Sequence, residues 1–315
     1  MILIVTSQSD YTADWLVLEL ERRGTQFARF NTDSYPSSTH LVWHEDGASS
    51  LAFTGTVVDL SEVTAVWYRR PVPPVLPPGL SAGRSAWAAA EAREALDGVW
   101  KTLTANWVNH PDRNRLADCK PEQLRRARAL GFDVPASLVT NHPDAAVQFA
   151  RAHEHGVICK PLFSGRIDIE GRSQLFFTSL LDADALKALN HAGPEPYLFQ
   201  ALIDKRYDVR VTVIGNQAFP VRIESQNVDP DAEIDWRRGD TETLAHHTER
   251  LPNDLADLCV ALTHSYGLRF AAIDLARTES GYVFFEINPN GQWAWIEQRT
   301  GLPLRARLVD LLIEG

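Results

Sequence analysis

Short apolar runs alternate with amphipathic segments along most of this chain. Ile2 to Thr6 has the pattern of a buried strand, Tyr11 to Arg23 that of an amphipathic helix ending at Gly24, and Gln26 to Phe30 that of a second strand. A strand, a helix and a strand in this order are typical of a βαβ unit, so we expect a parallel sheet at the N-terminus. The first connection lacks the GxGxxG pattern of dinucleotide-binding folds.

The C-terminal half has the alternation of antiparallel strands. In the run YDVRVTVI, Asp208, Arg210 and Thr212 would lie on one strand face and the intervening valines on the other. A turn of sequence IGNQ precedes a return strand with Arg222 and Glu224 on one face. Two arginines facing a common cleft could hold a phosphoryl or carboxylate group between them. An exposed ladder of ion pairs with Asp208 and Glu224 is the alternative.

The most informative pattern lies near the C-terminus, in the run GYVFFEINPNG. Alternation would place Glu286 and Asn288 on one face of a strand, with Phe285 and Ile287 on the other. Pro289 and the residues after it stop the strand and permit a tight turn, which a tryptophan-rich segment follows. Two oxygen-bearing side chains would therefore leave the sheet together.

A third oxygen ligand is expected on the preceding strand. Asp274 is the single acidic residue of the apolar run RFAAIDLAR, and TESG at residues 278–281 predicts a hairpin turn between the two runs. Folding at this turn would bring Asp274 beside Glu286. Because Mg²⁺ prefers oxygen ligands, usually one or two carboxylates shared with substrate phosphates, we expect a magnesium site at Asp274, Glu286 and Asn288. Acidic residues scattered along a strand edge are the alternative.

Basic residues at the ends of predicted strands are candidates for binding anions. The apolar strand Val157 to Cys159 leads into Lys160, whose burial is costly unless an anion pairs with it. The glycine-bearing loop behind it could contact phosphates through backbone N–H groups, although it is not a GxxxxGKT loop. Upstream, the strand Val63 to Pro71 contains Arg69 and Arg70 at its end, which could bind an acidic peptide or lie in solvent.

The order of these elements predicts three domains. We expect an N-terminal domain over residues 1–115, a small central domain over 116–195 and a C-terminal domain over 196–315. The run PVPPVLPPG excludes regular structure, Arg84 to Leu103 predicts a helix, and Asp118 is expected to cap the helix that follows it. The fold class is accordingly α/β (α+β), with an antiparallel sheet in its C-terminal part.

Composition excludes several classes of protein. Of 315 residues, 31 are lysine or arginine and 41 are aspartate or glutamate, and the formal charge of −10 argues against nucleic-acid or membrane-surface binding. Three cysteines without CxxC spacing indicate neither a disulfide framework nor a zinc site, and the adjacent His246 and His247 lack the spacing of zinc ligands. No apolar run approaches the ~18 residues of a membrane span, so we expect a cytoplasmic protein.

The expected ligands Asp274, Glu286 and Asn288 resemble the C-terminal hairpin of the ATP-grasp ligases, which carries an Asp followed by Glu-x-Asn. The longer strings EINPNGQWAWIE and, near the N-terminus, FNTDSYP resemble specifically the ATP-grasp maturases of ribosomal peptides, which make crosslinked products of the graspetide or microviridin type. This resemblance covers most of the chain. It implies an ATP-grasp fold with a pre-ATP-grasp domain, a lid and a C-terminal domain carrying the metal hairpin, and ATP and Mg²⁺ as cofactors, with two metal ions expected.

The resemblance also assigns roles to residues outside the hairpin. It implies that Lys120, in the first turn of a predicted helix, and Lys160, on the lid, contact the nucleotide phosphates. A Lys120 side chain exposed to solvent is the alternative. It further implies an adenine-binding hinge and a set of substrate contacts. The hinge residues are Gln200, Ala201, Leu202 and Ile203, and the substrate-contact candidates are Arg69, Arg70, Asp235 and Arg237.

These groups together suit carboxylate activation. The γ-phosphate of ATP would move to a carboxylate and a nucleophile would attack the acyl phosphate, while Arg210 and Arg222, with Asp208 beside them, would offset the developing charge. By resemblance, an Asp or Glu side chain of a ribosomal precursor peptide is joined to a Ser, Thr or Lys side chain of the same peptide, and the enzyme binds the precursor's leader segment. The resemblance also leads us to expect a homodimer.

Two alternative functions stay open. One is a ligase that adds a free amino acid or amine, as in the ribosomal-protein glutamate ligases and the glutathione synthases. The other is a non-catalytic protein that binds nucleotide or peptide, against which the intact Lys120, Lys160, Asp274, Glu286 and Asn288 argue.

Overall fold

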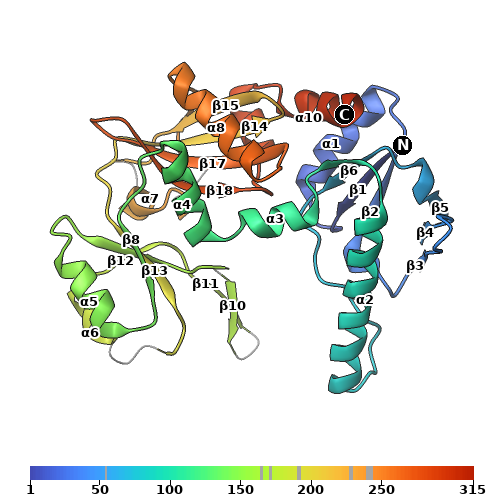
Figure 1. The fold of residues 1–315 in the computed structure, drawn as a ribbon, viewed down its shortest axis with the longest axis horizontal. Coiled ribbons are helices and arrows are strands. Elements are labelled where there is room, and N and C mark those ends of the chain that lie inside the picture. Colours follow the sequence, from blue (N-terminus) through green and yellow to red (C-terminus); the bar gives the residue numbers. More distant parts are fainter. Residues whose placement is uncertain (54, 164–165, 170–171, 190–192, 227–229, 239–243) are drawn as a thin grey trace.

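The computed structural model describes residues 1–53, 55–163, 166–169, 172–189, 193–226, 230–238 and 244–315. Within them the chain is a mixed α/β structure with an N-terminal, a central and a C-terminal part, each built on a sheet of its own, which confirms the expected fold class. Figure 1 shows the N-terminal sheet at one end of the molecule and the other two parts at the opposite end, with a short helix, Pro111–Ala117, running between them.

The N-terminal part contains the expected βαβ unit. Its elements are β1 (Ile2–Thr6), α1 (Tyr11–Arg22), β2 (Phe27–Asn31), η1 (Thr32–Ser34), β3 (Thr39–Val42), β4 (Ser50–Phe53), β5 (Thr56–Asp59), η2 (Leu60–Glu62), β6 (Ala65–Tyr68), α2 (Ala82–Thr102) and β7 (Asn106–Val108). A parallel sheet has the order β2-β1-β6-β7, and a small antiparallel sheet the order β3-β4-β5. The Asp10 side chain accepts a hydrogen bond from the Thr12 N–H, which caps α1.

The central part is an antiparallel sheet with helices beside it. Its elements are α3 (Pro111–Ala117), α4 (Lys120–Leu130), β8 (Ser137–Thr140), α5 (Pro143–Arg151), β9 (Val157–Lys160), β10 (Arg166–Ile169), β11 (Arg172–Leu175), β12 (Ser179–Leu180), α6 (Ala183–Ala188) and β13 (Tyr197–Ala201). The sheet order is β12-β9-β13-β8, so this sheet includes a strand that lies beyond the proposed boundary at residue 195. Asp118 does not cap α4, because α3 ends just before it and Cys119 occupies the cap position.

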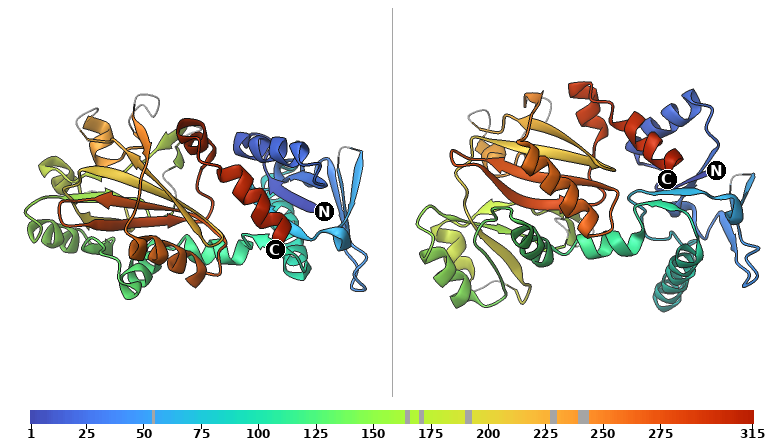
Figure 2. Two further views of the ribbon diagram at one scale, coloured as in Figure 1. Left: turned by 90° about the horizontal axis from the view of Figure 1, so that it is seen from above. Right: turned by 45° about the horizontal axis from the view of Figure 1, so that its top comes forward.

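The C-terminal part is a five-stranded antiparallel sheet of order β16-β15-β14-β17-β18. Its elements are β14 (Tyr207–Ile214), β15 (Gln217–Ile223), α7 (Pro230–Ile234), β16 (His246–Thr248), α8 (Asn253–Ser265), β17 (Phe270–Arg277), β18 (Tyr282–Asn288), α9 (Ala294–Thr300) and α10 (Leu304–Glu314). One face of the sheet packs against α8 and α4. Figure 2 shows α10 lying against α1, where Leu308 and Leu16 share a buried core that joins the two ends of the chain.

The register of β17 and β18 confirms the predicted hairpin. Asp274 lies directly opposite Glu286, and the Thr278 N–H donates to the Gly281 carbonyl at 2.8 Å across the turn. A bulge at Phe285 interrupts the alternation, so the prediction for this residue is wrong. Phe284, not Phe285, packs in the core, and the Phe285 ring turns to the other side.

None of the described helices has both the length and the apolar character that a membrane span requires.

Candidate active site

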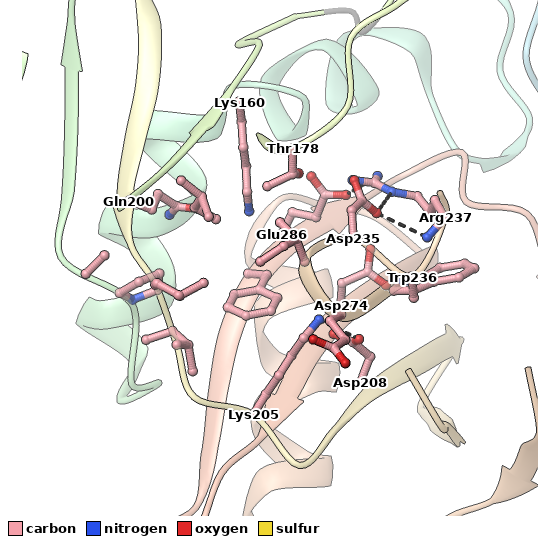
Figure 3. Close-up of a pocket in the computed structure, with 18 residues that line it drawn as sticks. Lys160, Thr178, Gln200, Lys205, Asp208, Asp235, Trp236, Arg237, Asp274 and Glu286 are labelled. Atoms are coloured by element: carbon pink, nitrogen blue, oxygen red, sulfur yellow. Dashed lines mark hydrogen bonds and ion pairs between the residues drawn. The ribbon is translucent and has the colours of Figure 1, made fainter. Parts of the chain in front are cut away.

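A cavity between the central and C-terminal sheets brings together most of the predicted site. About 590 Å³ of space free of protein atoms lies between its walls, including space that is open to solvent. Its walls come from the ends of β9 and β13, the hairpin of β17 and β18, and the segment after α7. Figure 3 shows Lys160 entering from one side and Glu286, Asp274 and Arg237 from the other.

Asp274 is held in place by a buried arginine. Both carboxylate oxygens of Asp274 accept hydrogen bonds from Arg210 Nη1 at 2.8 Å, and β14 presents Arg210 directly opposite Asp274. Burial raises the pKa of Asp274, an effect that the positive charge of Arg210 opposes. Arg210 therefore lies beside the hairpin that carries the expected metal ligands.

Glu286 is the centre of an ion-pair network. Its Oε2 accepts from Lys120 Nζ at 3.2 Å, and its Oε1 accepts from Arg237 Nη1 at 3.1 Å. Burial alone would raise the pKa of this carboxyl, but Arg237, Lys120 and Lys160 hold it well below its usual range. Glu286 is therefore ionised at neutral pH and able to bind a cation.

The expected metal ligands are compatible with a magnesium ion. Asp274 and Glu286 face each other across the hairpin, and Asn288, opposite Ala272, lies on the same strand face. Among the described residues, no three His, Cys, Asp or Glu side chains cluster in a way that could hold a metal. Two carboxylates and one amide, completed by phosphate oxygens, match what Mg²⁺ needs better than the nitrogen and sulfur sets of zinc.

Lys160 ends β9 and lines the cavity, as its position in the sequence predicts. Its Nζ lies 5.0 Å from the centre of the Phe285 ring, and burial lowers its pKa to about 8. No ion pair of Lys160 with another described residue is present, so the lysine is suited to meet an anionic ligand. The glycines at positions 165 and 171 of the loop behind it lie outside the described residues.

The predicted adenine hinge forms one wall of the cavity. Gln200 is almost fully buried; its Nε2 donates to Ser137 Oγ at 3.0 Å, and its Oε1 has no hydrogen-bond partner within the described part of the chain. The four hinge residues that line the cavity are Gln200, Ala201, Leu202 and Ile203.

Backbone hydrogen bonds fix the course of this hinge. The Ala201 N–H donates to the Ala136 carbonyl and the Leu202 N–H to the Gly156 carbonyl, each at 2.9 Å. The N–H groups of Ala201 and Leu202 are therefore already hydrogen-bonded within the protein, and Ile203 is the first hinge residue after them.

A short loop after α7 closes the cavity from the C-terminal side. Asp235 accepts two hydrogen bonds from the Arg237 guanidinium, at 2.8 and 2.9 Å, so that Arg237 bridges Asp235 and Glu286. The intervening Trp236 packs against Trp295, with ring centres 5.4 Å apart and ring planes inclined at 45°. Both predicted substrate residues of this loop, Asp235 and Arg237, thus line the cavity, and Trp295 contacts the loop through Trp236.

Asp208 lies in the cavity but pairs with a residue that sequence reasoning missed. Lys205 Nζ donates to Asp208 Oδ2 at 2.7 Å, and both side chains are buried. Burial raises the pKa of Asp208, and Lys205 opposes this rise. The sequence feature that could have identified Lys205 is its position between the apolar hinge strand and the alternating strand β14. A lysine that is buried there needs an anionic partner.

Arg222 lies on the other face of the sheet, so the prediction that it shares a cleft with Arg210 is wrong. The turn between β14 and β15 has only two residues, which sets Arg222 opposite Val209. The Arg222 guanidinium lies 4.0 Å from the Tyr207 ring, and its Nε is 2.5 Å from Glu224 Oε1. The ion pair with Glu224 proposed as the alternative is therefore present.

Arg69 and Arg70 differ from each other. Arg69 is 1% exposed and bonds to the Asn290 carbonyl and to Gln292 Oε1, the latter at 2.8 Å, so it is neither solvated nor open to a peptide. Arg70 is exposed at the surface, and its Nε donates to the same Asn290 carbonyl at 3.0 Å. Of this pair, Arg70 alone keeps an accessible guanidinium for a substrate.

Comparisons with known proteins agree with this geometry. Residues 1–115 match the MvdD pre-ATP grasp domain, and residues 124–312 match the RimK-like ATP-grasp domain. A probable alpha-L-glutamate ligase from Enterobacter sp. (strain 638) is 28% identical over 128 residues; this match covers 40% of the chain and only 40% of that relative's length.

Two solved structures are similar along their whole length. Macrocyclase MdnC from Microcystis aeruginosa MRC, bound with precursor peptide MdnA, is 29% identical; the match covers 100% of this chain and 99% of that one, with a TM-score of 0.89. A RiPP-associated ATP-grasp ligase from Chryseobacterium gregarium, in complex with ADP and a leader and core peptide, is 29% identical, with coverages of 99% and 96% and a TM-score of 0.90. These comparisons confirm the resemblance inferred from the hairpin motif. Because the RimK-like domain spans more than half of the chain, the protein belongs to the RimK-like ATP-grasp family.

Proposed function

We propose that this protein is an ATP- and Mg²⁺-dependent ligase that crosslinks side chains within a ribosomally made precursor peptide. The observation that carries the proposal is a cavity that joins the expected adenine hinge, Lys160 and a pair of opposed carboxylates, with Lys120 bonded to one of these carboxylates, Glu286. The full-length likeness to two enzymes solved with precursor peptides supports the choice of a peptide substrate.

ATP would lie along the hinge with its phosphates towards the hairpin. The Ile203 N–H and the neighbouring carbonyls of the hinge would bind the adenine edge. Gln200 Oε1, which has no hydrogen-bond partner among the residues that the structure describes, could accept from the adenine amino group. Lys120 and Lys160 enter the site near Glu286, and we assign them to the phosphates. On binding, Lys120 would exchange its carboxylate partner Glu286 for phosphate oxygens.

Asp274, Glu286 and Asn288 would hold the magnesium ion. When bound, Mg²⁺ supplies positive charge that offsets the charge on the transferred phosphoryl group. Arg210 keeps the Asp274 carboxylate in the orientation seen here, through two hydrogen bonds to Nη1. We therefore assign Arg210 a role at the reacting centre and assign none to Arg222.

The reaction would proceed in two steps. A carboxylate oxygen of a precursor Asp or Glu attacks the γ-phosphorus of ATP, the bond to the bridging oxygen breaks, and ADP leaves. A Ser or Thr hydroxyl, or a Lys amine, then attacks the acyl carbon, loses its proton, and phosphate departs. We assign Arg237, whose guanidinium is fixed by Asp235, to the peptide carboxylate. Each crosslink removes one water from the peptide.

A second candidate is favoured by the curated relative, a probable alpha-L-glutamate ligase. In that reaction the nucleophile would be the amine of a free amino acid, and the peptide or protein would gain mass. The same nucleotide site would serve both reactions, since they differ only in the nucleophile.

We further propose a leader segment on the precursor, a homodimer and a cytoplasmic location. The solved ligase from Chryseobacterium gregarium contains a leader peptide, which supports the first of these.

The test is the intact mass of a candidate precursor peptide after incubation with the protein, ATP and Mg²⁺. Loss of one water mass per crosslink supports the macrocyclase, and a gain of an amino-acid residue supports the second candidate. An unmodified peptide accompanied by sustained ATP hydrolysis would refute the crosslinking proposal.

A further inference from the structure

The turn that ends the metal hairpin is bonded to the N-terminal part of the chain. Asn109, 2% exposed, follows β7 and donates from Nδ2 to the Phe270 carbonyl at 2.8 Å and to the Pro289 carbonyl at 3.1 Å. Its Oδ1 accepts from the Arg269 and Phe270 N–H groups at 2.9 and 3.0 Å. One buried side chain therefore satisfies four backbone groups, at the start of β17 and just after the end of β18.

Other side chains of the N-terminal part hold the next residues, which we call the PNGQ turn (Pro289–Gln292). Arg69 donates to the Asn290 carbonyl and to Gln292 Oε1, and the Thr12 hydroxyl donates to the same Gln292 oxygen. Because Arg69 is buried, these bonds are shielded from water.

The PNGQ turn packs closely against Ala272 and Arg210, which are neighbours of the expected metal ligands. A Cβ added at Gly291 would lie 2.2 Å from the Ala272 Cβ and 2.7 Å from Arg210 Nη2. Ala272 is opposite Asn288, and Arg210 bonds Asp274. A shift of the turn would therefore move Asn288, because Asn288 immediately precedes the turn in the chain. It would also move Arg210, because Gly291 packs against the Arg210 side chain.

We propose that Asn109 is a positioning residue for the magnesium site, acting through the backbone of the metal hairpin. The inference rests on the proposed ATP- and Mg²⁺-dependent function. Metal ligands depend on the groups that orient them, and loss of such a group typically weakens metal binding by about 10- to 100-fold. Asn109 orients two strands at once, so the same range is expected here.

The experiment measures ADP binding by calorimetry over a series of Mg²⁺ concentrations, with the full chain and without peptide. In Asn109→Ala, the Mg²⁺ concentration for half-maximal ADP binding should rise about 10- to 100-fold. The matched control is Asn106→Ala, since Asn106 lies on β7, three residues before Asn109, and also bonds the C-terminal part, at the Leu311 carbonyl and the Arg269 side chain. It should lower the melting temperature without moving the Mg²⁺ requirement more than about twofold.

A second variant keeps the inference testable if Asn109→Ala does not fold. Asn109→Asp retains the acceptor for the two N–H groups but turns an oxygen towards the Phe270 and Pro289 carbonyls, so it should also raise the Mg²⁺ requirement. An unchanged requirement in the folded variants, with only a lower melting temperature, would overturn the inference. ADP binding by the unmodified protein that ignores Mg²⁺ would refute the proposed metal site and this inference with it.

Discussion

The two faces of the C-terminal sheet are built from the same strands but carry different functions. On one face Val209, Val211, Phe284 and Ile287 pack against α8 and α4 with almost no exposure. On the other face Arg210, Asp274 and Glu286 form the candidate site. Because neighbouring residues of a strand point to opposite faces, a single step along β18 separates Ile287, which packs in the core, from Glu286, which we propose as a metal ligand.

The largest expected effect comes from Glu286→Gln on the site face. Gln keeps the shape but removes the charge that binds metal and pairs with Lys120 and Arg237, so ligase activity should fall by roughly 10²- to 10³-fold or more. ADP release in the presence of precursor measures it. Glu279→Gln, at an 83% exposed position in the turn of the same hairpin, is the control and should change activity little. Near-normal activity of Glu286→Gln would show that Glu286 is not a metal ligand.

The next effect is the pH dependence of ATP binding. Lys160 is charged below its lowered pKa of about 8 and loses its proton as the pH rises through that value. Affinity for ATP should therefore be highest below pH 8 and decline above it by about tenfold or more in total, the contribution of one charge-assisted hydrogen bond. Calorimetry over this pH range measures the effect, and Lys160→Met should abolish it. A profile that is the same in both proteins would contradict the assignment of Lys160.

A smaller effect is expected from Ile287→Val on the core face, one residue from Glu286. It should lower the free energy of unfolding by about 0.5–1.5 kcal/mol, because it removes a buried methylene, while leaving the Mg²⁺ requirement unchanged. Urea unfolding measures the first quantity. The same substitution at Ile313, which is 52% exposed, is the matched control and should have little effect. A changed Mg²⁺ requirement at full stability would show that the two faces are not independent.

The smallest effect is expected from Arg222→Ala. Its half-exposed ion pair with Glu224 contributes at most about 1 kcal/mol to stability, and its side chain is on the face away from the cavity. Ligase activity should stay within about twofold of normal, in contrast to a large loss in Arg210→Ala. A loss of similar size in both variants would show that Arg222 also contributes to the reaction.

The sequence is sufficient to predict those strands and site residues whose position follows from the local pattern of apolar and polar residues. The pairing of Asp274 and Glu286 is predicted because Asp274 is the single acidic residue of its apolar run, Glu286 lies on an alternating strand, and TESG predicts the turn between the two. Lys160 was identified because a lysine at the end of an apolar strand needs an anionic partner. The βαβ opening followed from hydrophobic periodicity alone.

The remaining errors depend on registers and contacts that local pattern does not specify. The face of Arg222 is decided by a two-residue turn, which pairs it with Val209, and the bulge at Phe285 reverses one step of the alternation. The burial of Arg69 depends on Asn290 and Gln292, more than two hundred residues away in the chain. Such contacts follow from the assembled structure and leave no periodic signal.

The bonds from Thr12, Arg69 and Asn109 to the PNGQ turn also limit how freely this protein can be recombined with its relatives. An exchange of N-terminal segments between such enzymes, made to change which peptide is recognised, would cut across these bonds. Chimeras should therefore carry the PNGQ turn over together with the N-terminal segment it contacts, so that the unit of exchange is discontinuous in the sequence.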